Sequence, residues 1–206
     1  MISLLVSTVM AQEVAPEKKK ISNQVFFRGA YARLQDSRGG EVFTDTATGN
    51  NSGKNGYSVA AGIDLALTEP NLLFGHATLL GEVFMEYSRY AHAKVLQTTS
   101  ALLGGTNQSE VSVSEMNVTI APKVRIDSLG WVRPFVIPGG ISWLVNSPPS
   151  NDTTYLDLGI PFAAGVDIVL HERISLGVDG RYTYAFDHTN THNAYLSTGA
   201  YAAINF

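Results

Sequence analysis

One short run of the sequence contains residue types that could carry out acyl-transfer chemistry. Asp187, His188 and Thr189 are consecutive, and His192 follows shortly after. A histidine oriented by a carboxylate can take the proton of a hydroxyl nucleophile, as in serine-type esterases. The hydroxyl directly beside His188 belongs to a threonine, and no serine occurs between residues 176 and 196. We therefore interpret the run as a polar loop and expect the protein not to be an enzyme.

The sequence offers no set of residues for a metal or a redox group. It contains no cysteine, which excludes thiolate ligands, thiol nucleophiles and disulfide bonds. None of its five histidines belongs to a set of three ligands at metal-binding spacing. The formal net charge of −4 argues against a nucleic-acid partner. We expect no cofactor, no metal and no nucleic acid.

Eleven charged residues follow a pattern of their own. Each stands in the polar row of a segment in which apolar and polar residues alternate. In the clearest segment, 56–68, Tyr57, Val59 and Ile63 alternate with small or polar residues and with Asp64. Successive side chains of a strand point to opposite faces, so such a segment has one apolar and one polar face. The proposed apolar rows contain no charge. The eleven residues of the polar rows are Arg28, Asp64, Glu82, Glu86, Glu115, Lys123, Arg125, Asp157, Asp167, Asp179 and Arg181.

Eight alternating segments are expected to form strands. They span residues 23–34, 56–68, 75–89, 112–126, 131–144, 156–170, 174–186 and 194–206. The segment 131–144 is ambiguous, because both of its rows are largely apolar and Pro134 and Pro138 weaken its pairing. For this segment we assign the outward row to Phe135, Ile137, Gly139, Ile141 and Trp143.

The composition favours a membrane barrel. Only 16% of the residues are charged, yet the mean hydropathy is +0.05 and no run approaches the roughly 20 apolar residues of a membrane helix. In a membrane barrel, half of each strand faces lipid and half faces a polar interior, so the average hydropathy resembles that of a soluble protein. A soluble lipocalin-like barrel is disfavoured, because its apolar rows would face inward and its charges outward.

The expected connections between the strands alternate in length. Residues 35–55 and 90–111 form long connections, whereas 69–74, 127–130 and 171–173 are short. Membrane barrels have short periplasmic turns and longer outer loops, and an even strand number brings both termini to the periplasmic side. We predict an all-β fold for residues 23–206, an eight-stranded antiparallel up-and-down transmembrane β-barrel with this asymmetry.

The N-terminal residues are expected to be a targeting segment. Residues 2–10 form a short apolar run, and Val9-Met10-Ala11 matches the small-residue pattern before a signal-peptidase site. We predict a signal peptide at residues 1–11, truncated at its start because the usual basic residues are missing. A periplasmic leader at residues 12–22 would follow.

The chain from residue 23 onward resembles the small bacterial outer-membrane β-barrels, the OmpA-like transmembrane domain and its porin-like relatives. The resemblance rests on the eight segments, on residues 131–142 (WVRPFVIPGGIS) and 158–167 (LGIPFAAGVD), and on the terminal Phe206. It implies a monomer in the outer membrane of a Gram-negative bacterium, in contact with outer-membrane lipid and lipopolysaccharide. The barrel-assembly machinery of such bacteria reads the last strand, which here assigns the assembly signal to Phe206, Ile204 and Tyr201.

Charged residues inside so narrow a barrel must pair with one another. Side chains nearly fill the lumen of an eight-stranded barrel, and an isolated buried ion is very costly. Counting along the strands places five charged residues near mid-height, and we expect them to form an ion-pair cluster. These are Arg28, Asp64, Glu82, Asp179 and Arg181. The predicted role is structural, in envelope integrity, with a closed lumen and surface loops for contacts.

Two alternatives remain open. The eleven inner charges comprise four positive and seven negative residues, which favours a narrow pore for cationic solutes if the lumen conducts. The second alternative is a lipid-modifying barrel enzyme. The run at His188 loosely resembles the His-x-Ser-Asn motif of lipid A deacylases, but the serine of that motif is absent.

Overall fold

The computed structural model describes residues 23–35, 54–96, 103–104, 108–147, 156–186 and 193–206. Nine strands account for most of these residues. They are β1 (Gln24–Leu34), β2 (Asn55–Ala66), β3 (Ala77–Leu96), β4 (Gln108–Ile126), β5 (Val132–Ile137), β6 (Ile141–Ser147), β7 (Leu156–His171), β8 (Ile174–Ala185) and β9 (Tyr195–Asn205). Within these ranges there is no helix, and hence none long and apolar enough to cross a membrane.

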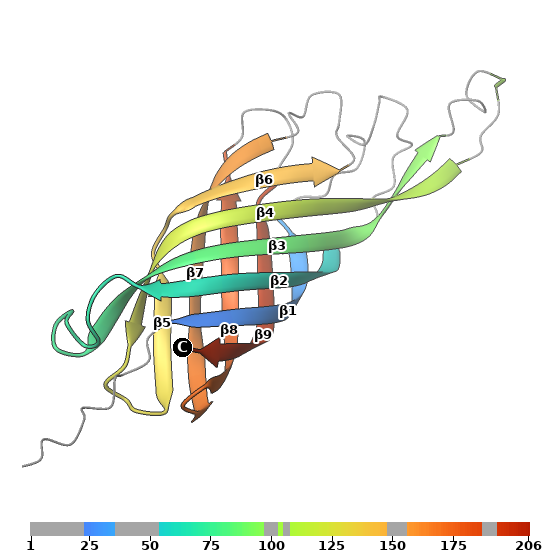
Figure 1. Ribbon diagram of the computed structural model, residues 1–206. Helices are drawn as coiled ribbons and strands as arrows, with labels where there is room; N and C mark the ends of the chain where they lie inside the picture. The colour runs from blue at the N-terminus through green and yellow to red at the C-terminus, as the bar shows by residue number, and fades with distance from the viewer. Residues whose placement is uncertain (1–22, 36–53, 97–102, 105–107, 148–155, 187–192) are drawn as a thin grey trace, which may run out of the picture.

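The strands close into a barrel with eight strand positions around its wall (Figure 1). β1 pairs with both β2 and β9, and antiparallel pairing continues from neighbour to neighbour around the wall. β5 and β6 lie one after the other between β4 and β7, so together they occupy one of the eight strand positions. The predicted eight-stranded antiparallel barrel is therefore confirmed.

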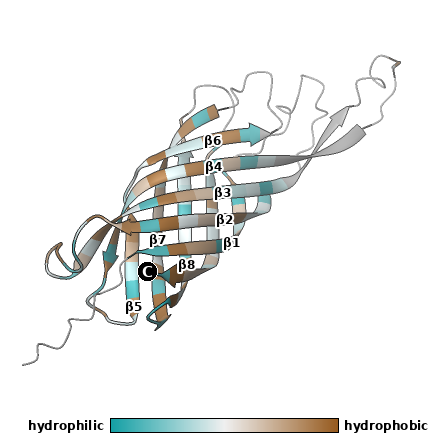
Figure 2. Cartoon of the chain, viewed as in Figure 1, coloured by the Kyte–Doolittle hydropathy of each residue, from teal (hydrophilic) through white to brown (hydrophobic). Residues whose placement is uncertain are grey.

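The two faces of the wall differ in chemistry, as the alternating colours of Figure 2 show. On β1, Phe27 is 64% exposed, whereas its neighbours Phe26 and Arg28 are 1% and 3% exposed. Along the other strands, leucine, valine, isoleucine and aromatic side chains dominate the exposed face, and most buried side chains of the lumen are polar or charged. A soluble barrel would show the reverse, so the lipocalin-like alternative is wrong.

The two ends of the barrel are distinct. The connections at 67–76, 127–131 and 172–173 are short and lie at the end where the described chain begins and finishes, since the Phe206 amide donates to the Asn23 carbonyl at 3.0 Å. We call this the turn end. The opposite end, where β1 finishes and β2 begins, is called the loop end (Figure 1). The short connections are those that the sequence predicted.

β3 and β4 are longer than predicted. Half of the expected loop at 90–111 is strand, because β3 continues to Leu96 and β4 begins at Gln108. Their register shifts once, between Arg89 and His92, and pairing then resumes. The two strands project as a ribbon beyond the loop end (Figure 1).

The predicted outward row of 131–144 is wrong in its first half. Phe135 and Ile137 are 3% and 2% exposed and face the lumen, whereas Val136 between them faces outward. Beyond the break, Ile141 is exposed on the outer face and Trp143 is partly exposed, as predicted.

The reversal has a local cause at residues 138–140, which separate β5 from β6. At Gly140 the chain lies so close to β4 that a Cβ atom would stand 2.6 Å from the carbonyl oxygen of Ile120. A break in the strand that does not continue the alternation moves every later side chain to the opposite face. The sequence-based assignment of one unbroken row was therefore inverted for β5.

Aromatic rings in the lumen lie over glycines of the adjacent strand. A Cβ atom at each of these glycines would lie only 2.1–2.6 Å from a ring atom. The cross-strand pairs are Phe26–Gly62, Phe135–Gly165 and Tyr201–Gly177. Glycine on one strand therefore creates the space for a large ring on its neighbour, and this explains how Phe135 fits inside.

The outward rows are not entirely without charge. Arg33 on β1 and Arg89 on β3 are exposed and alternate in step with the outward residues of their strands. Both lie towards the loop end of the wall. The prediction of charge-free outward rows is wrong at these two positions. The predicted signal peptide, 1–11, and leader, 12–22, lie outside the described residues.

Candidate functional site

The centre of the lumen contains a continuous chain of ion pairs. Arg28 from β1 contacts Asp179 through Nε at 2.6 Å and Glu86 through Nη1 at 2.7 Å. Arg181 contacts the other carboxylate oxygen of Asp179 through Nε at 2.8 Å. Its two terminal nitrogens hold Glu82 in a bidentate pair, at 2.6 and 3.2 Å. The guanidinium groups therefore alternate with carboxylates, an arrangement that offsets the cost of burying each charge.

Lys123 from β4 extends the chain towards β2. Its Nζ lies 2.7 Å from Asp64 Oδ2 and 3.6 Å from Glu82 Oε2. The amide of Gln24 also donates to Asp64, at 2.7 Å. We call the seven connected residues the lumen network: Arg28, Asp64, Glu82, Glu86, Lys123, Asp179 and Arg181. It contains three cations and four carboxylates, and its side chains are at most 7% exposed.

The lumen network contains all five residues proposed for the central cluster and two others, Glu86 and Lys123. Arg28 and Glu86 stand on either side of Ala60 in the strand register, and the small alanine leaves room for their contact. Lys123 pairs with Leu80, on the turn-end side of the network, and its long side chain reaches the network from there. Both residues stood in the predicted inner rows, but counting heights along the chain ignored strand tilt and side-chain length.

The pair between Arg181 and Glu82 crosses the full width of the barrel. Arg181 stands on β8 and Glu82 on β3. Three strand positions lie between these two strands in either direction around the wall. A second crossing lies nearby, where Asn117 on β4 donates to the hydroxyl of Tyr195 on β9 at 2.8 Å. The same hydroxyl donates to Glu86 at 2.6 Å. Opposite walls are thus joined directly through the lumen.

Aromatic rings contact two of the three cations of the lumen network, Arg181 and Lys123. The guanidinium carbon of Arg181 lies 3.9 Å from the centre of the Phe84 ring, and Lys123 Nζ lies 3.9 Å from that of Phe135. Cation–π contacts in a site sheltered from water each stabilise by about 2 kcal/mol. A cavity of about 10 Å³ beside Arg181 has room for a single water molecule. The paired side chains and these rings span the lumen at this level, so the arrangement can act as a plug.

A second charged group lies nearer the turn end, and we call it the Asp127 group. Asp127 accepts a hydrogen bond from Thr78 and one from Arg125 Nε at 2.9 Å, and Arg133 Nε lies at 3.5 Å. These residues come from adjacent segments of β3, β4 and β5, so the contacts follow the wall. The Arg133 side chain is 15% exposed, more than any member of the lumen network.

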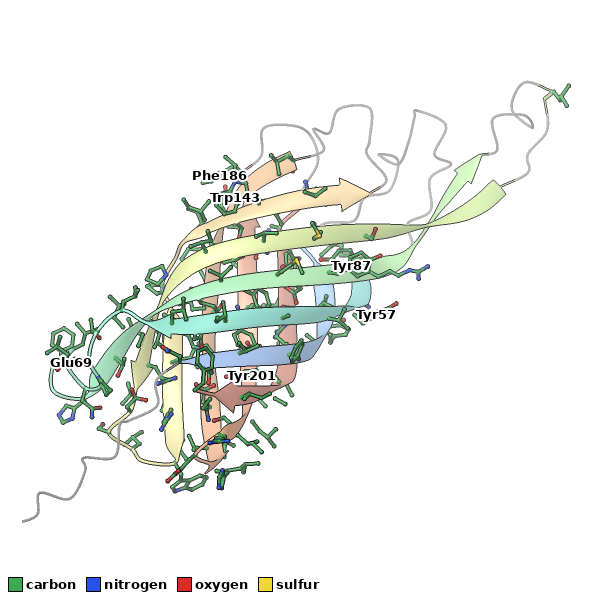
Figure 3. All side chains as sticks on the ribbon, viewed as in Figure 1. Tyr57, Glu69, Tyr87, Trp143, Phe186 and Tyr201 are labelled. Carbon is green, nitrogen blue, oxygen red and sulfur yellow. The ribbon has the colours of Figure 1, made fainter. Side chains whose placement is uncertain are left out.

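The three residues proposed as the assembly signal face different environments. Phe206 and Ile204 are 55% and 60% exposed on the outer surface. Tyr201 is 4% exposed, and its hydroxyl donates to Asp167 inside the lumen (Figure 3). In this structure Tyr201 therefore packs the interior, and only Phe206 and Ile204 present their side chains to the surroundings.

The residues considered for catalysis, from Asp187 to His192, lie outside the described residues. Within the described ranges, no group of three histidine or acidic side chains is arranged to hold a metal ion. The site defined by the structure is therefore the lumen network.

Comparison with known proteins defines the fold class. No family model matches the chain, and no curated protein matches it in sequence. Solved structures do match. The Neisserial surface protein A, NspA, aligns with a TM-score of 0.57 and 14% identity, over 89% of this chain and 97% of that one. The outer-membrane enzyme PagL aligns at 0.50 and 11%, over 90% and 100%.

The outer-membrane protein OprG from Pseudomonas aeruginosa aligns with a TM-score of 0.50 and 8% identity, over 90% of this chain and 97% of that chain. The chain therefore has the fold of the small outer-membrane β-barrels. At such identities the likeness establishes the fold alone, and the neighbours include an enzyme, so the role has to be argued from the chain's own residues.

Proposed function

We propose that this protein is a passive, monomeric outer-membrane barrel that supports the integrity of the cell envelope. The observation that carries the proposal is the Arg181–Glu82 pair, which joins opposite walls at mid-lumen. The narrow lumen, the paired charges and the aromatic rings that contact two of the cations favour a closed interior over a conduit. The apolar outer surface, including Phe27 and Ile204, suits contact with lipid.

The proposed orientation places the turn end and both termini in the periplasm. Short connections at this end and the projecting β3–β4 ribbon at the other match the asymmetry of membrane barrels. The loop end would then face the cell exterior, where the loops are available for contacts. Outward-facing Phe206 and Ile204 would form the signal for the barrel-assembly machinery.

A narrow cation-selective pore is the second candidate. Eight carboxylates are buried in the described wall, against four fully buried cations and the partly buried Arg133. If the lumen network opened transiently, this surplus of negative charge would attract cations and repel anions. The lipid-modifying enzyme is the third candidate, and it would depend on His188.

Deletion of the gene in the native host distinguishes the three candidates. We expect deleted cells to become more sensitive to detergent, with lipid A of unchanged mass and unchanged uptake of small cations. A plasmid copy with His188→Ala should restore resistance as well as the wild-type copy does. Loss of cation uptake would support the pore instead, and a change in lipid A mass that depends on His188 would support the enzyme.

A further inference from the structure

The outward rows of the described strands carry positive charge on one side of the barrel, on β1 and β3. Among the described side chains, Arg33 and Arg89 are the only charged residues in the outward rows of the strands. They flank β2, since Arg33 pairs with Asn55 and Arg89 pairs with Tyr57. We call these four residues the β1–β3 patch. On β9, the other neighbour of β1, the residue paired with Arg33 is Leu196, which is 47% exposed.

The depth of the β1–β3 patch matches the edge of a membrane. Leu79 and Arg89 stand on the same face of β3, ten residues apart, which is about 33 Å along the strand at a rise of about 3.3 Å per residue. With a strand tilt of about 40°, the height difference is about 25 Å, the height of the apolar band of such barrels. Leu79 is the outward residue of β3 nearest the turn end, and taking it as that limit of the apolar band places Arg89 at the limit nearer the loop end, where an outward arginine costs little.

Tyrosines mark the same boundary. Tyr31, Tyr57 and Tyr87 are 51%, 55% and 45% exposed on β1, β2 and β3, and Figure 3 shows Tyr57 and Tyr87 towards the loop end. Tyrosine favours the membrane–water interface because its ring and its hydroxyl are both satisfied there. An arginine at this depth meets the head groups of the lipids.

The polar groups of the β1–β3 patch are donors. Guanidinium groups bind phosphate in a bidentate manner and remain charged at all physiological pH values. The Tyr31 hydroxyl donates to Asn55 Oδ1 at 2.6 Å, which directs the amide NH₂ of Asn55 away from that contact as a further donor. Two strand spacings and a two-residue offset place the Cα atoms of the arginines about 12 Å apart. Both side chains can therefore reach one large head group.

We propose that the β1–β3 patch binds the phosphate groups of lipid A, the membrane anchor of lipopolysaccharide, in the outer leaflet. The proposal rests on the orientation given under the proposed function, because lipopolysaccharide must surround the loop end. Two localised charges, on β1 and β3 with the polar Asn55 of β2 between them, fit a ligand with discrete phosphates, and the neighbouring apolar rows fit its acyl chains. The occupant is thus a single phosphorylated glycolipid seated against β1, β2 and β3.

Native mass spectrometry of the refolded full chain in detergent tests this proposal. The probes are lipid A with both phosphates, dephosphorylated lipid A and phosphatidylglycerol. Replacing Arg33→Gln and Arg89→Gln together should weaken binding of phosphorylated lipid A by about tenfold or more, since charge-assisted bonds to phosphate are lost. Dephosphorylated lipid A should bind the wild type as weakly as phosphorylated lipid A binds the double variant. Arg173→Gln, at the turn end, is the matched control and should bind like the wild type.

Equal binding of phosphorylated lipid A by the wild type and the double variant would overturn the proposal. Arginine-dependent binding of phosphatidylglycerol with the same affinity would also overturn it, because the patch would then recognise any anionic lipid. A second pair, Arg33→Lys with Arg89→Lys, retains the charge and should keep most of the binding if the double glutamine variant does not fold. Conductance of the same preparations separates the two proposals, since a steadily conducting wild type would refute the closed lumen and leave the lipid A site intact.

Discussion

The lumen network and the Asp127 group use the same residue types and differ in what they connect. In the lumen network, Arg181 and Glu82 join opposite walls, and their side chains are 7% and 0% exposed. In the Asp127 group, the contacts run between adjacent segments, and the Arg133 side chain is 15% exposed. The position of an ion pair relative to the wall therefore decides whether it crosses the lumen or only lines it.

The largest expected effect comes from removing the cation that crosses the lumen. Arg181→Ala removes the bidentate partner of Glu82 and one of the two arginines that contact Asp179, so the free energy of unfolding should fall by about 3–5 kcal/mol. Urea unfolding in lipid vesicles measures this loss. Arg181→Lys retains the charge without the bidentate geometry and should lie between the wild type and the alanine variant. An alanine variant as stable as the wild type would show that the crossing contributes nothing.

The second crossing should have a smaller effect. Tyr195→Phe removes the hydroxyl that accepts from Asn117 and donates to Glu86, at a cost of about 1–3 kcal/mol because buried polar groups lose a bond. Tyr31→Phe is the matched control, since its hydroxyl bond to Asn55 is exposed. If the two variants unfold at the same urea concentration, burial of the Tyr195 hydroxyl is not the source of the stability.

The Asp127 group should respond least. Arg133→Gln should lower the free energy of unfolding by at most about 1 kcal/mol, because Arg133 is partly exposed and Arg125 and Thr78 still contact Asp127. The same urea titration provides the measurement. A loss as large as that of Arg181→Ala would erase the distinction between contacts that cross the lumen and contacts that follow the wall.

The orientation of β5 also affects the lumen network, because Phe135 contacts Lys123 of this network. Spin labels at Val136 and Ile141 should report lipid, whereas a label at Phe135 should be shielded from lipid-soluble quenchers. If a label at Phe135 were accessible to the quenchers and one at Val136 were protected, Phe135 would face outward, as predicted from the sequence. Its ring could then not contact Lys123.

Alternation of side chains made most of the fold predictable. A charge on the lipid face is costly, so Asp64, Asp179 and Arg181 indicate the inward faces of their strands from the sequence alone. In β5 both rows are largely apolar, and its one charge, Arg133, stands in the row of Phe135 that faces the lumen. The charge rule therefore favoured the observed face, whereas an unbroken alternation back from Trp143 favoured the opposite one. The reversal depends on the close approach of Gly140 to β4, which is a tertiary contact.

The lumen network was harder to predict than the fold. Arg28, Asp64, Glu82, Asp179 and Arg181 were chosen by height along the strands, and the structure places all five in the network. Their pairing could not be derived, because the register around the closed wall decides which side chains face one another. Outward Arg33 and Arg89 were missed because the apolar rows were not followed to the loop-end limits of their strands.

Single-channel recording in planar lipid bilayers tests the closed lumen most directly. The wild-type protein should give no steady current above the baseline, because the Arg181–Glu82 pair, with the Phe84 ring against Arg181, crosses the lumen at mid-height. Arg181→Ala should introduce measurable, cation-preferring currents in the same bilayers, because carboxylates remain along the opened path. Large and steady currents from the wild-type protein would contradict the account and identify the barrel as a pore.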